Sequence, residues 1–181
     1  MKKNLFELNK KIAVVAGGAG FLGSQFALAL ADFGALPIIL DINNKSINNL
    51  KKKFLKKKKK AVFFLTDLDN ENMVNATINL IIKKYKRIDC LINSAGLTGS
   101  NMSKTNKNFF KNFENFDSSL WQESLDANLS SVFLVTKSVS RHMLKRKDGA
   151  IVNISSDVGI IAPDHRIYER NKRFNYKGVD F

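Results

Sequence analysis

The chain has 181 residues, of which 44% are hydrophobic and 25% are charged, with ten glycines, two prolines and a single cysteine. This composition excludes disordered, collagen-like and disulfide-stapled proteins, and the length suits one domain that buries about 70% of its unfolded surface. The formal net charge of +14 suggests an acidic or phosphate-rich partner. However, residues 51–60 alone hold eight lysines and no acid, so more than half of this charge belongs to one short segment.

The first apolar stretch, residues 12–31, imitates a secretory signal peptide, because it is uncharged, follows Lys10 and Lys11 and ends in Ala-Leu-Ala. Four glycines interrupt it and Asp32 follows at once, which argues against export. No other stretch approaches the roughly 18 uncharged residues that a membrane-spanning helix needs. We therefore expect a cytoplasmic protein that makes no contact with a membrane.

Strand-like and helix-like segments alternate along the chain. Each strand-like segment is a continuous apolar run, which is typical of a parallel sheet whose two faces are covered by helices. The predicted strands span residues 12–16, 37–40, 61–65, 88–92 and 150–154. The predicted helices span residues 22–33, 70–85 and about 118–147, with a further helix through the lysine run. The fold class is therefore α/β.

The spacing of the large apolar residues predicts which side of each helix is buried. The lysines fall on the solvent side of their helix, and no arginine or aromatic residue alternates with them to read bases, so we expect no nucleic-acid partner. The sides expected to be buried are Leu22, Phe26, Leu30 and Phe33; Ile47, Leu50, Phe54 and Leu55; Val74, Ile78, Ile81 and Ile82; and Trp121, Leu125, Leu129, Val132, Phe133, Val139 and Met143. Residues 97–117 are predicted to form a loop. Its phenylalanines are expected to anchor the loop, and the alternative that they line the mouth of a substrate site stays open; they are Phe109, Phe110, Phe113 and Phe116.

A glycine-rich turn joins the first predicted strand to the first helix. Gly17, Gly20 and Gly23 allow a sharp bend and let a pyrophosphate lie against the N–H groups at the start of the helix. Asp41 ends the next strand, where a carboxylate can accept both ribose hydroxyls of a dinucleotide and repel a 2′-phosphate. The pattern predicts NAD as cofactor rather than NADP. Two structural alternatives stay open, namely a turn that only packs and Asp41 as the N-cap of the following helix.

Further motifs follow the glycine turn in a fixed order. The turn reads Ala16-Gly17-Gly18-Ala19-Gly20-Phe21-Leu22-Gly23, and it is followed by Asp67-Leu68, Asn93-Ser94-Ala95-Gly96, Asp126-Ala127-Asn128-Leu129 and Ile151-Val152-Asn153-Ile154-Ser155-Ser156. Together these motifs resemble the short-chain dehydrogenase/reductase family from Lys10 to about Pro163, although the GxxGxxG spacing is closer to the family's extended branch. The resemblance implies a Rossmann-like doubly wound parallel sheet with strand order 3-2-1-4-5, here without the family's last strands and helices.

The resemblance also implies an NAD-dependent oxidoreductase that transfers hydride between nicotinamide and a small-molecule alcohol or carbonyl substrate. Asp67 and Leu68 would border the adenine. The residues expected to bind the cofactor are Gly17, Gly20, Phe21, Leu22, Gly23, Asp41, Asp67, Leu68, Asn93, Ala95 and Gly96. We expect no metal site, because Cys90, His142 and His165 are too isolated to form a ligand cluster.

Catalysis in this family uses a tyrosine as proton donor or acceptor, with a lysine one helical turn away that favours its phenolate near neutral pH. By position, Ser156 would hydrogen-bond the substrate oxygen, with Ser155 as the alternative serine. Asn128 would hold a water in the proton relay. The structural alternatives are a serine that caps a turn after the strand and an asparagine at a helix kink.

Tyr168 and Lys172 have the spacing of the catalytic pair, but polar residues and a glycine follow where the family has an apolar helix. We expect a look-alike in an irregular tail over residues 164–181. Because family members have about 250 residues as one domain, we expect residues 1–181 to form a single incomplete Rossmann domain. The chain would end before the true pair, and its full-length form would be a homo-oligomer.

Residues 156–169 also resemble a subgroup of the family found near bacterial surface-glycan and nonulosonic-sugar genes. This resemblance implies a sugar or a sugar derivative as substrate. Two other classes of function stay open. One is a dinucleotide-binding module without turnover, and the other is a nucleic-acid binder that uses the lysine-rich helix.

Overall fold

The computed structural model describes residues 6–97, 113–156 and 159–161. The chain divides into two compact units. The first, which we call the sheet unit, combines residues 1–96 and 127–154, and the second unit combines residues 97–126 and 155–181. All five described strands belong to the sheet unit, whereas helix α5 (Ser118–Leu125) belongs to the second unit.

The described strands form one parallel sheet with the order β3-β2-β1-β4-β5, as the family resemblance implied. They are β1 (Ile12–Ala16), β2 (Leu36–Asp41), β3 (Val62–Leu65), β4 (Cys90–Asn93) and β5 (Ala150–Asn153). Each boundary lies within two residues of the predicted one. The register places Val14 of β1 between Ile38 of β2 and Leu91 of β4, in the centre of the sheet.

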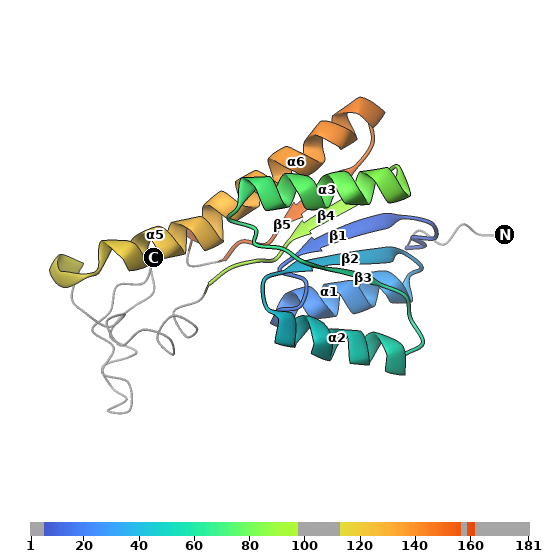
Figure 1. The fold of residues 1–181 in the computed structure, drawn as a ribbon, viewed down its shortest axis with the longest axis horizontal. Coiled ribbons are helices and arrows are strands. Elements are labelled where there is room, and N and C mark those ends of the chain that lie inside the picture. Colours follow the sequence, from blue (N-terminus) through green and yellow to red (C-terminus); the bar gives the residue numbers. More distant parts are fainter. Residues whose placement is uncertain (1–5, 98–112, 157–158, 162–181) are drawn as a thin grey trace. The chain divides into compact units, whose positions relative to one another are not determined.

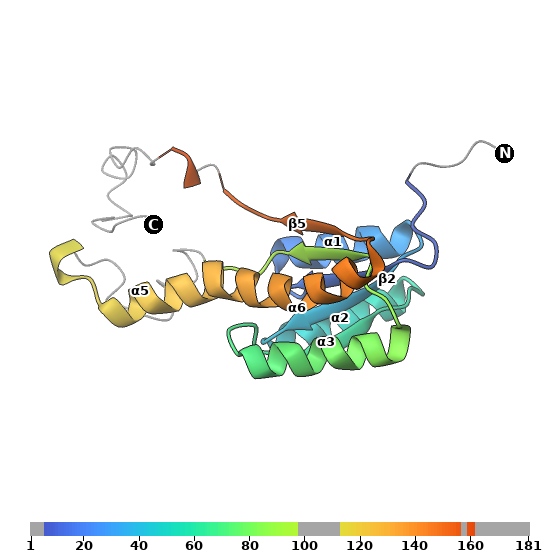
Figure 2. The same ribbon diagram turned by 90° about the horizontal axis from the view of Figure 1, so that it is seen from above.

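Helices cover both faces of this sheet, as Figures 1 and 2 show. They are α1 (Phe21–Asp32) and α2 (Asn44–Lys56) on one face, and α3 (Glu71–Tyr85) and α6 (Ser131–Arg146) on the other. Successive side chains of a strand point to opposite faces, and the two cores follow this alternation. Val15 packs in the core with α1 and α2, whereas Val14 packs in the core with α3 and α6.

Local sequence explains where several helices begin and end. The side-chain oxygens of Asn43 and Asn70 cap α2 and α3, because they accept the N–H groups of Ser46 (3.0 Å) and Met73 (3.1 Å). Gly34 follows α1 with φ +94°, a conformation that glycine adopts without steric penalty. It therefore ends α1 as the sequence predicted.

Two predicted apolar faces are wrong in part. α1 buries its small residues, with Ala27 at 0% exposure, while Leu22 and Phe33 remain 47% and 48% exposed. In α2, Leu55 is 76% exposed, because it lies one position beyond the buried stripe. The predicted core residues that are buried are Ile47, Leu50, Phe54, Val74, Ile78, Ile81, Val139 and Met143. The lysines of α2 lie on its solvent side, as predicted.

The long helix predicted over residues 118–147 is interrupted. A π-helical segment, Asp126–Ser130, separates α5 from α6. Trp121, Leu129 and Phe133, which the spacing placed on the buried side, are 43%, 64% and 61% exposed. A π turn contains more residues than an α-helical turn, so residues before and after it no longer follow one α-helical spacing. The prediction of one continuous buried side along the whole helix was therefore wrong.

Among the four phenylalanines of the predicted loop, Phe116 has a described side chain, which packs against Leu120 of α5 within the second unit. The short 3-10 segment Phe113–Asn115 precedes it. Phe109, Phe110 and the predicted tail lie outside the described residues.

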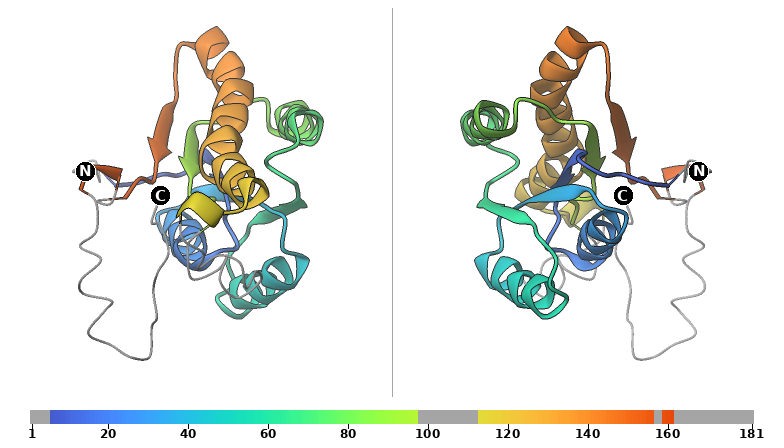
Figure 3. Two further views of the ribbon diagram at one scale, coloured as in Figure 1. Left: turned by 90° about the vertical axis from the view of Figure 1, so that its left-hand side faces the viewer. Right: turned by 90° about the vertical axis from the view of Figure 1, so that its right-hand side faces the viewer.

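β5 lies at one edge of the described sheet and pairs with β4 alone (Figure 3). All four of its residues are exposed, including Ile151 at 37% and Val152 at 46%. β5 is therefore less covered than the central strands in the described part of the chain, as expected for a sheet without the family's last strands and helices.

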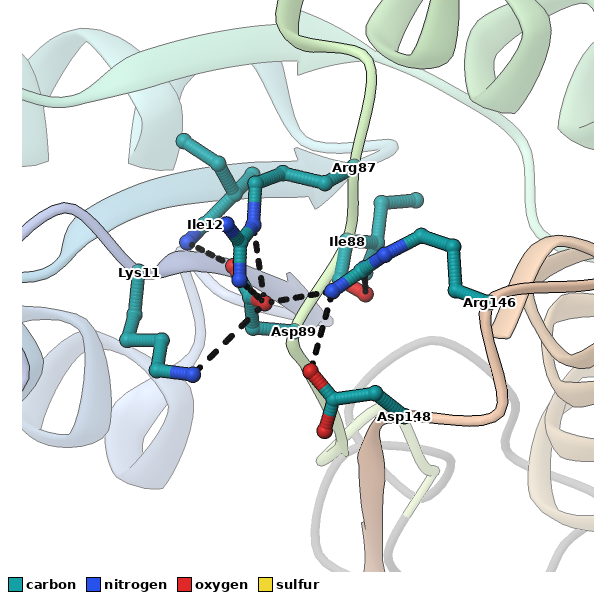
Figure 4. Close-up of polar contacts among 7 residues, drawn as sticks. All are labelled: Lys11, Ile12, Arg87, Ile88, Asp89, Arg146 and Asp148. Atoms are coloured by element: carbon teal, nitrogen blue, oxygen red, sulfur yellow. Dashed lines mark hydrogen bonds and ion pairs between the residues drawn. The ribbon is translucent and has the colours of Figure 1, made fainter. Parts of the chain in front are cut away.

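Asp89 holds the amino-terminal edge of the sheet together (Figure 4). It is 7% exposed and accepts the Ile12 N–H at 2.9 Å. It also forms ion pairs with Arg87, with Arg146 (3.1 Å) and with Lys11 (3.9 Å). Burial by itself raises the pKa of Asp89, but hydrogen bonds from Arg87, Ile12 and Arg146 outweigh it and lower that pKa. The cluster therefore joins the starts of β1 and β4 to the end of α6.

Candidate functional site

The predicted cofactor residues of the sheet unit gather at the carboxyl edge of the sheet. β1, β2 and β4 end there at Ala16, Asp41 and Asn93. The strand order reverses at this point, because β2 and β3 lie on one side of β1 while β4 and β5 lie on the other. Such a switch point is where open α/β sheets bind ligands.

The glycine turn is fixed to both strands that neighbour β1. The N–H groups of Gly17 and Gly18 both donate to the carbonyl oxygen of Leu40, at 2.9 and 3.2 Å. Gly17 has φ +68°, and a Cβ there would lie 2.5 Å from the backbone of Ala95. A Cβ on Gly23 would collide with the Gly17 carbonyl. Internal packing alone therefore explains why Gly17 and Gly23 are glycines. For these two positions, the alternative of a turn that only packs is sufficient.

Gly20 differs from the other two motif glycines. Its φ of −70° suits any residue, and a Cβ there would meet the Gly17 carbonyl oxygen at 3.2 Å and nothing else described. In the described structure no side chain caps α1, and its first turn holds no acid. The N–H groups at the start of α1 can therefore bind an anion. Phe21 and Leu22, the first two residues of α1, have side chains that are 87% and 47% exposed.

Asp41 lies beside this turn and is only 8% exposed. Its Oδ2 accepts the N–H of Ala19 at 2.9 Å, and its Oδ1 accepts the N–H of Asn43 at 2.9 Å. The N-cap of α2 is Asn43, so the alternative that assigned the cap to Asp41 is wrong. The carboxylate instead joins the end of β2 to the glycine turn.

The end of β3 continues this edge. The Thr66 N–H donates to the Asp41 carbonyl oxygen at 2.9 Å, which places residues 66–68 next to the end of β2. Asp67 is partly exposed, and its Oδ1 accepts the Asp69 N–H at 3.1 Å. Leu68 is 8% exposed and packs in the core beneath α3. Of this predicted adenine-binding pair, Asp67 is therefore the more accessible side chain.

Asn93 is 2% exposed, and its side chain points into the protein. Its Nδ2 donates to Thr136 Oγ1 of α6 at 2.9 Å and to Asn153 Oδ1 of β5 at 2.7 Å. Its Oδ1 is buried and has no hydrogen-bond partner among the described residues. Ala95 and Gly96 are more exposed, so they are the residues of this motif that a ligand can reach. Thr136 was missed, since no sequence pattern singled it out.

Asn128 lies in the π-helical segment and is exposed. A Cβ on Gly96 would lie 2.8 Å from Asn128 Oδ1, so these two predicted site residues lie together. Ser131 supports the interrupted helix, because its hydroxyl donates to the Ala127 carbonyl oxygen at 2.8 Å. π segments of this kind frequently occur at functional sites. The sequence had marked Asn128 as a possible kink, but it gave no signal for Ser131.

The two serines considered for catalysis, Ser155 and Ser156, follow β5 and belong to the second unit. The Ser156 carbonyl oxygen accepts the Gly159 N–H at 3.2 Å. Tyr168 and Lys172 lie outside the described residues, so their assignment stays a prediction.

No group of three or more His, Cys, Asp or Glu side chains within the described ranges could hold a metal ion. Burial, followed by the charge of Asp89, raises the pKa of the Cys90 thiol, and burial lowers the pKa of His142. His165 lies outside the described residues. None of the helices that the structure describes has the length and apolar character needed to cross a membrane.

The residues at the carboxyl edge fit a dinucleotide. The uncapped start of α1 suits a diphosphate, and the position of Gly20 leaves room for it. The Asp41 carboxylate, which contacts the same turn, suits ribose hydroxyls. These features come from β1, α1 and β2, which belong to one unit.

Comparison with known proteins agrees with this geometry. The family model described as short chain dehydrogenase matches residues 11–168. The 3-oxoacyl-[acyl-carrier-protein] reductase FabG of Chlamydia muridarum is 32% identical over 154 residues, which are 84% of this chain and 58% of the relative. The D-threitol dehydrogenase of Mycolicibacterium smegmatis is 29% identical over 174 residues, 96% of this chain and 63% of the relative.

Solved structures show the same fold. The crystal structure of NAD+-bound xylitol dehydrogenase has a TM-score of 0.75 and 28% sequence identity, and the match covers 86% of this chain and 56% of that chain. The chain spans 58% of the length of the two FabG reductases that it matches, from Thermotoga maritima and Chlamydia muridarum.

Proposed function

Because the chain belongs to the short chain dehydrogenase family, we propose that it interconverts a hydroxyl and a carbonyl group with NAD as cofactor. Members of this family use NAD or NADP. The bound nicotinamide would accept or return the hydride. The residues of this chain would bind the diphosphate and ribose, orient the substrate and move its proton.

The position of Asp41 carries the proposal. Its buried carboxylate contacts Ala19 of the glycine turn, and each oxygen still has lone-pair capacity for a ribose hydroxyl. A 2′-phosphate would bring further negative charge against a carboxylate that water scarcely screens. No lysine or arginine occurs in the three residues after Asp41 to offset that repulsion. NAD is therefore favoured over NADP.

Direct titration of the protein with NAD and NADP tests this proposal. We expect NAD to bind at least about tenfold more tightly, because each 1.4 kcal/mol of repulsion is a factor of ten. Gly20→Val should abolish binding of both dinucleotides, since its branched side chain fills the room at the start of α1. Gly20→Ala adds one methyl at a permitted φ and serves as the matched control for folding. Tighter binding of NADP, or normal NAD binding by Gly20→Val, would contradict the proposal.

Two residues are proposed to act on the substrate. Ser156 would donate a hydrogen bond to the substrate oxygen, and Asn128 would hold a water that relays the proton. Support for Asn128 comes from its exposed position in the π-helical segment beside Gly96. Support for Ser156 comes from the family motif alone.

We further propose that the substrate is a polyhydroxylated compound, such as a sugar or a sugar derivative. The names of two relatives, D-threitol dehydrogenase and xylitol dehydrogenase, support this class. Binding of threitol, xylitol and cyclopentanol to the NAD complex tests this class without requiring the catalytic tyrosine and lysine, and the two polyols should bind more tightly. Tighter binding of cyclopentanol than of both polyols would contradict the substrate class while leaving the NAD proposal intact.

A further inference from the structure

We propose that Asp41 is a positioning residue that holds the glycine turn in its dinucleotide-binding shape, in addition to reading the ribose. The inference deepens the proposed function, because it concerns the same site. Its consequence is specific: replacing Asp41 cannot convert the protein from NAD to NADP, since the change removes the support of the turn for both cofactors.

The contacts of Asp41 carry this inference. Both carboxylate oxygens accept backbone N–H groups at 2.9 Å, one from Ala19 in the turn and one from Asn43 before α2. The carboxylate thus spans from the end of β2 to two different loops. Hydrogen bonds to a charged acceptor are about twice as strong as those between neutral groups, and water competes weakly at a residue that is 8% exposed.

The other described hydrogen bonds of the turn lie on either side of Ala19. The N–H groups of Gly17 and Gly18 bond to Leu40, and the Gly20 N–H bonds to the Gly17 carbonyl oxygen at 3.1 Å. Ala19 is partly exposed, and its side chain packs against the core beneath α1 and α2. Its bond to Asp41 is the one described hydrogen bond that the Ala19 backbone makes to β2. Without it, the Ala19 N–H loses its acceptor, while Gly17 and Gly18 keep their bonds to Leu40. We therefore expect the backbone between Gly18 and Gly20 to become more mobile.

The two roles of Asp41 make opposite predictions for Asp41→Ser. If the carboxylate only reads the ribose, its removal relieves the repulsion and NADP binds more tightly than to the wild-type protein. If it also positions the turn, NAD and NADP both lose affinity. ADP, which has no 2′-phosphate and no nicotinamide, should lose affinity in the same proportion as NAD.

Hydrogen exchange of the protein without any dinucleotide provides the independent measurement. We expect amide exchange in peptides that cover residues 17–23 to accelerate at least about tenfold in Asp41→Ser, because the Ala19 N–H loses its acceptor. Asp41→Asn should show an intermediate rate, since its amide oxygen can still accept from Ala19. Asp32→Asn is the matched control, because Asp32 is an exposed acid at the end of α1 that pairs with Lys59.

Unchanged exchange in Asp41→Ser and Asp41→Asn, or a gain in NADP affinity, would overturn the inference. If Asp41→Ser does not fold, the exchange rate of Asp41→Asn decides between the two roles. Failure of the wild-type protein to bind NAD would refute the proposed function, whereas the exchange result would still decide whether Asp41 holds the turn.

Discussion

Asp89 is the acidic residue with the largest number of basic partners among those described, and its environment predicts how stability depends on pH. Its pKa is lowered in the folded protein, so the folded state favours the charged carboxylate. The stabilisation is complete above the ordinary aspartate pKa of about 3.9 and is lost as the pH falls through the lower folded value. We therefore expect the free energy of unfolding to decrease when the pH drops below about 4, and Asp89 to account for part of this decrease.

Asp89→Asn tests that expectation by chemical denaturation between acidic and neutral pH. Removing one partner of a buried charge cluster typically costs about 3–5 kcal/mol, so the variant should be less stable at neutral pH. Its stability should also change less than that of the wild-type protein below about pH 4. Asp32→Asn, which breaks an exposed ion pair, should cost less than about 1 kcal/mol. Parallel pH profiles for Asp89→Asn and the wild-type protein would contradict this account.

At the scale of single residues, the sequence predicted which residues gather at the carboxyl edge, but not what their side chains contact. Asp41 was placed correctly at the end of β2, yet its bonds to Ala19 and Asn43 depend on loop geometry that no spacing encodes. Thr136 and Asn153 reach Asn93 from segments 43 and 60 residues away. Such distant pairings follow from the packed sheet, and a single sequence does not reveal them.

At the scale of elements, two helices end in a left-handed backbone conformation that is unfavourable for the lysines present there and that glycine would relieve. Lys86 and Lys147, which cap α3 and α6 at their carboxyl ends, have φ values of 65° and 54°. A side chain costs roughly 1–2 kcal/mol in this left-handed conformation, and the extra freedom of an unfolded glycine offsets part of the gain. Lys86→Gly should therefore raise the free energy of unfolding by about 0.5–1 kcal/mol.

Lys83→Gly is the matched control for this substitution. Lys83 lies in the last turn of α3, where the backbone is helical, so glycine there should lower stability by up to about 1 kcal/mol. Urea unfolding of both variants measures the two changes under the same conditions. A destabilised Lys86→Gly would show that the lysine side chain contributes more than its backbone conformation costs.

Elements were predicted better than their buried faces. Continuous apolar runs identified every described strand, because a central parallel strand must be apolar on both sides. The face of α1 was wrong in part. Its fully buried residues are small, Ala27 among them, whereas Leu22 and Phe33 are exposed. Leu30 is partly buried and packs against the core, as predicted. The π-helical segment around Asn128 was not predicted as such, since one added residue per turn leaves no mark in the composition.

At the scale of the whole molecule, the charge and the sheet edges matter most. The lysines of α2 lie on its solvent side, so the formal charge of +14 repels copies of the protein from one another. The sheet itself works in the opposite direction, because β5 pairs with β4 alone among the described strands. The ionic strength decides which effect dominates. Salt screens the charge repulsion between copies but leaves the strand edge unchanged, so added salt favours self-association.

The edge at β5 therefore predicts self-association that increases with salt. A strand edge that has no partner among the described residues and that exposes Ile151 and Val152 offers both hydrogen-bonding groups and apolar surface to a second chain. Val152→Lys should reduce association, because a lysine at the edge blocks close strand pairing. Leu55→Lys is the matched control, since it adds the same charge to an exposed apolar position of α2, which contacts the edge strand β3 rather than β5.

Sedimentation velocity at low and high salt measures the association of both variants. Equal effects of both substitutions would indicate charge repulsion alone. A larger effect of Val152→Lys, especially at high salt, would locate the contact at β5.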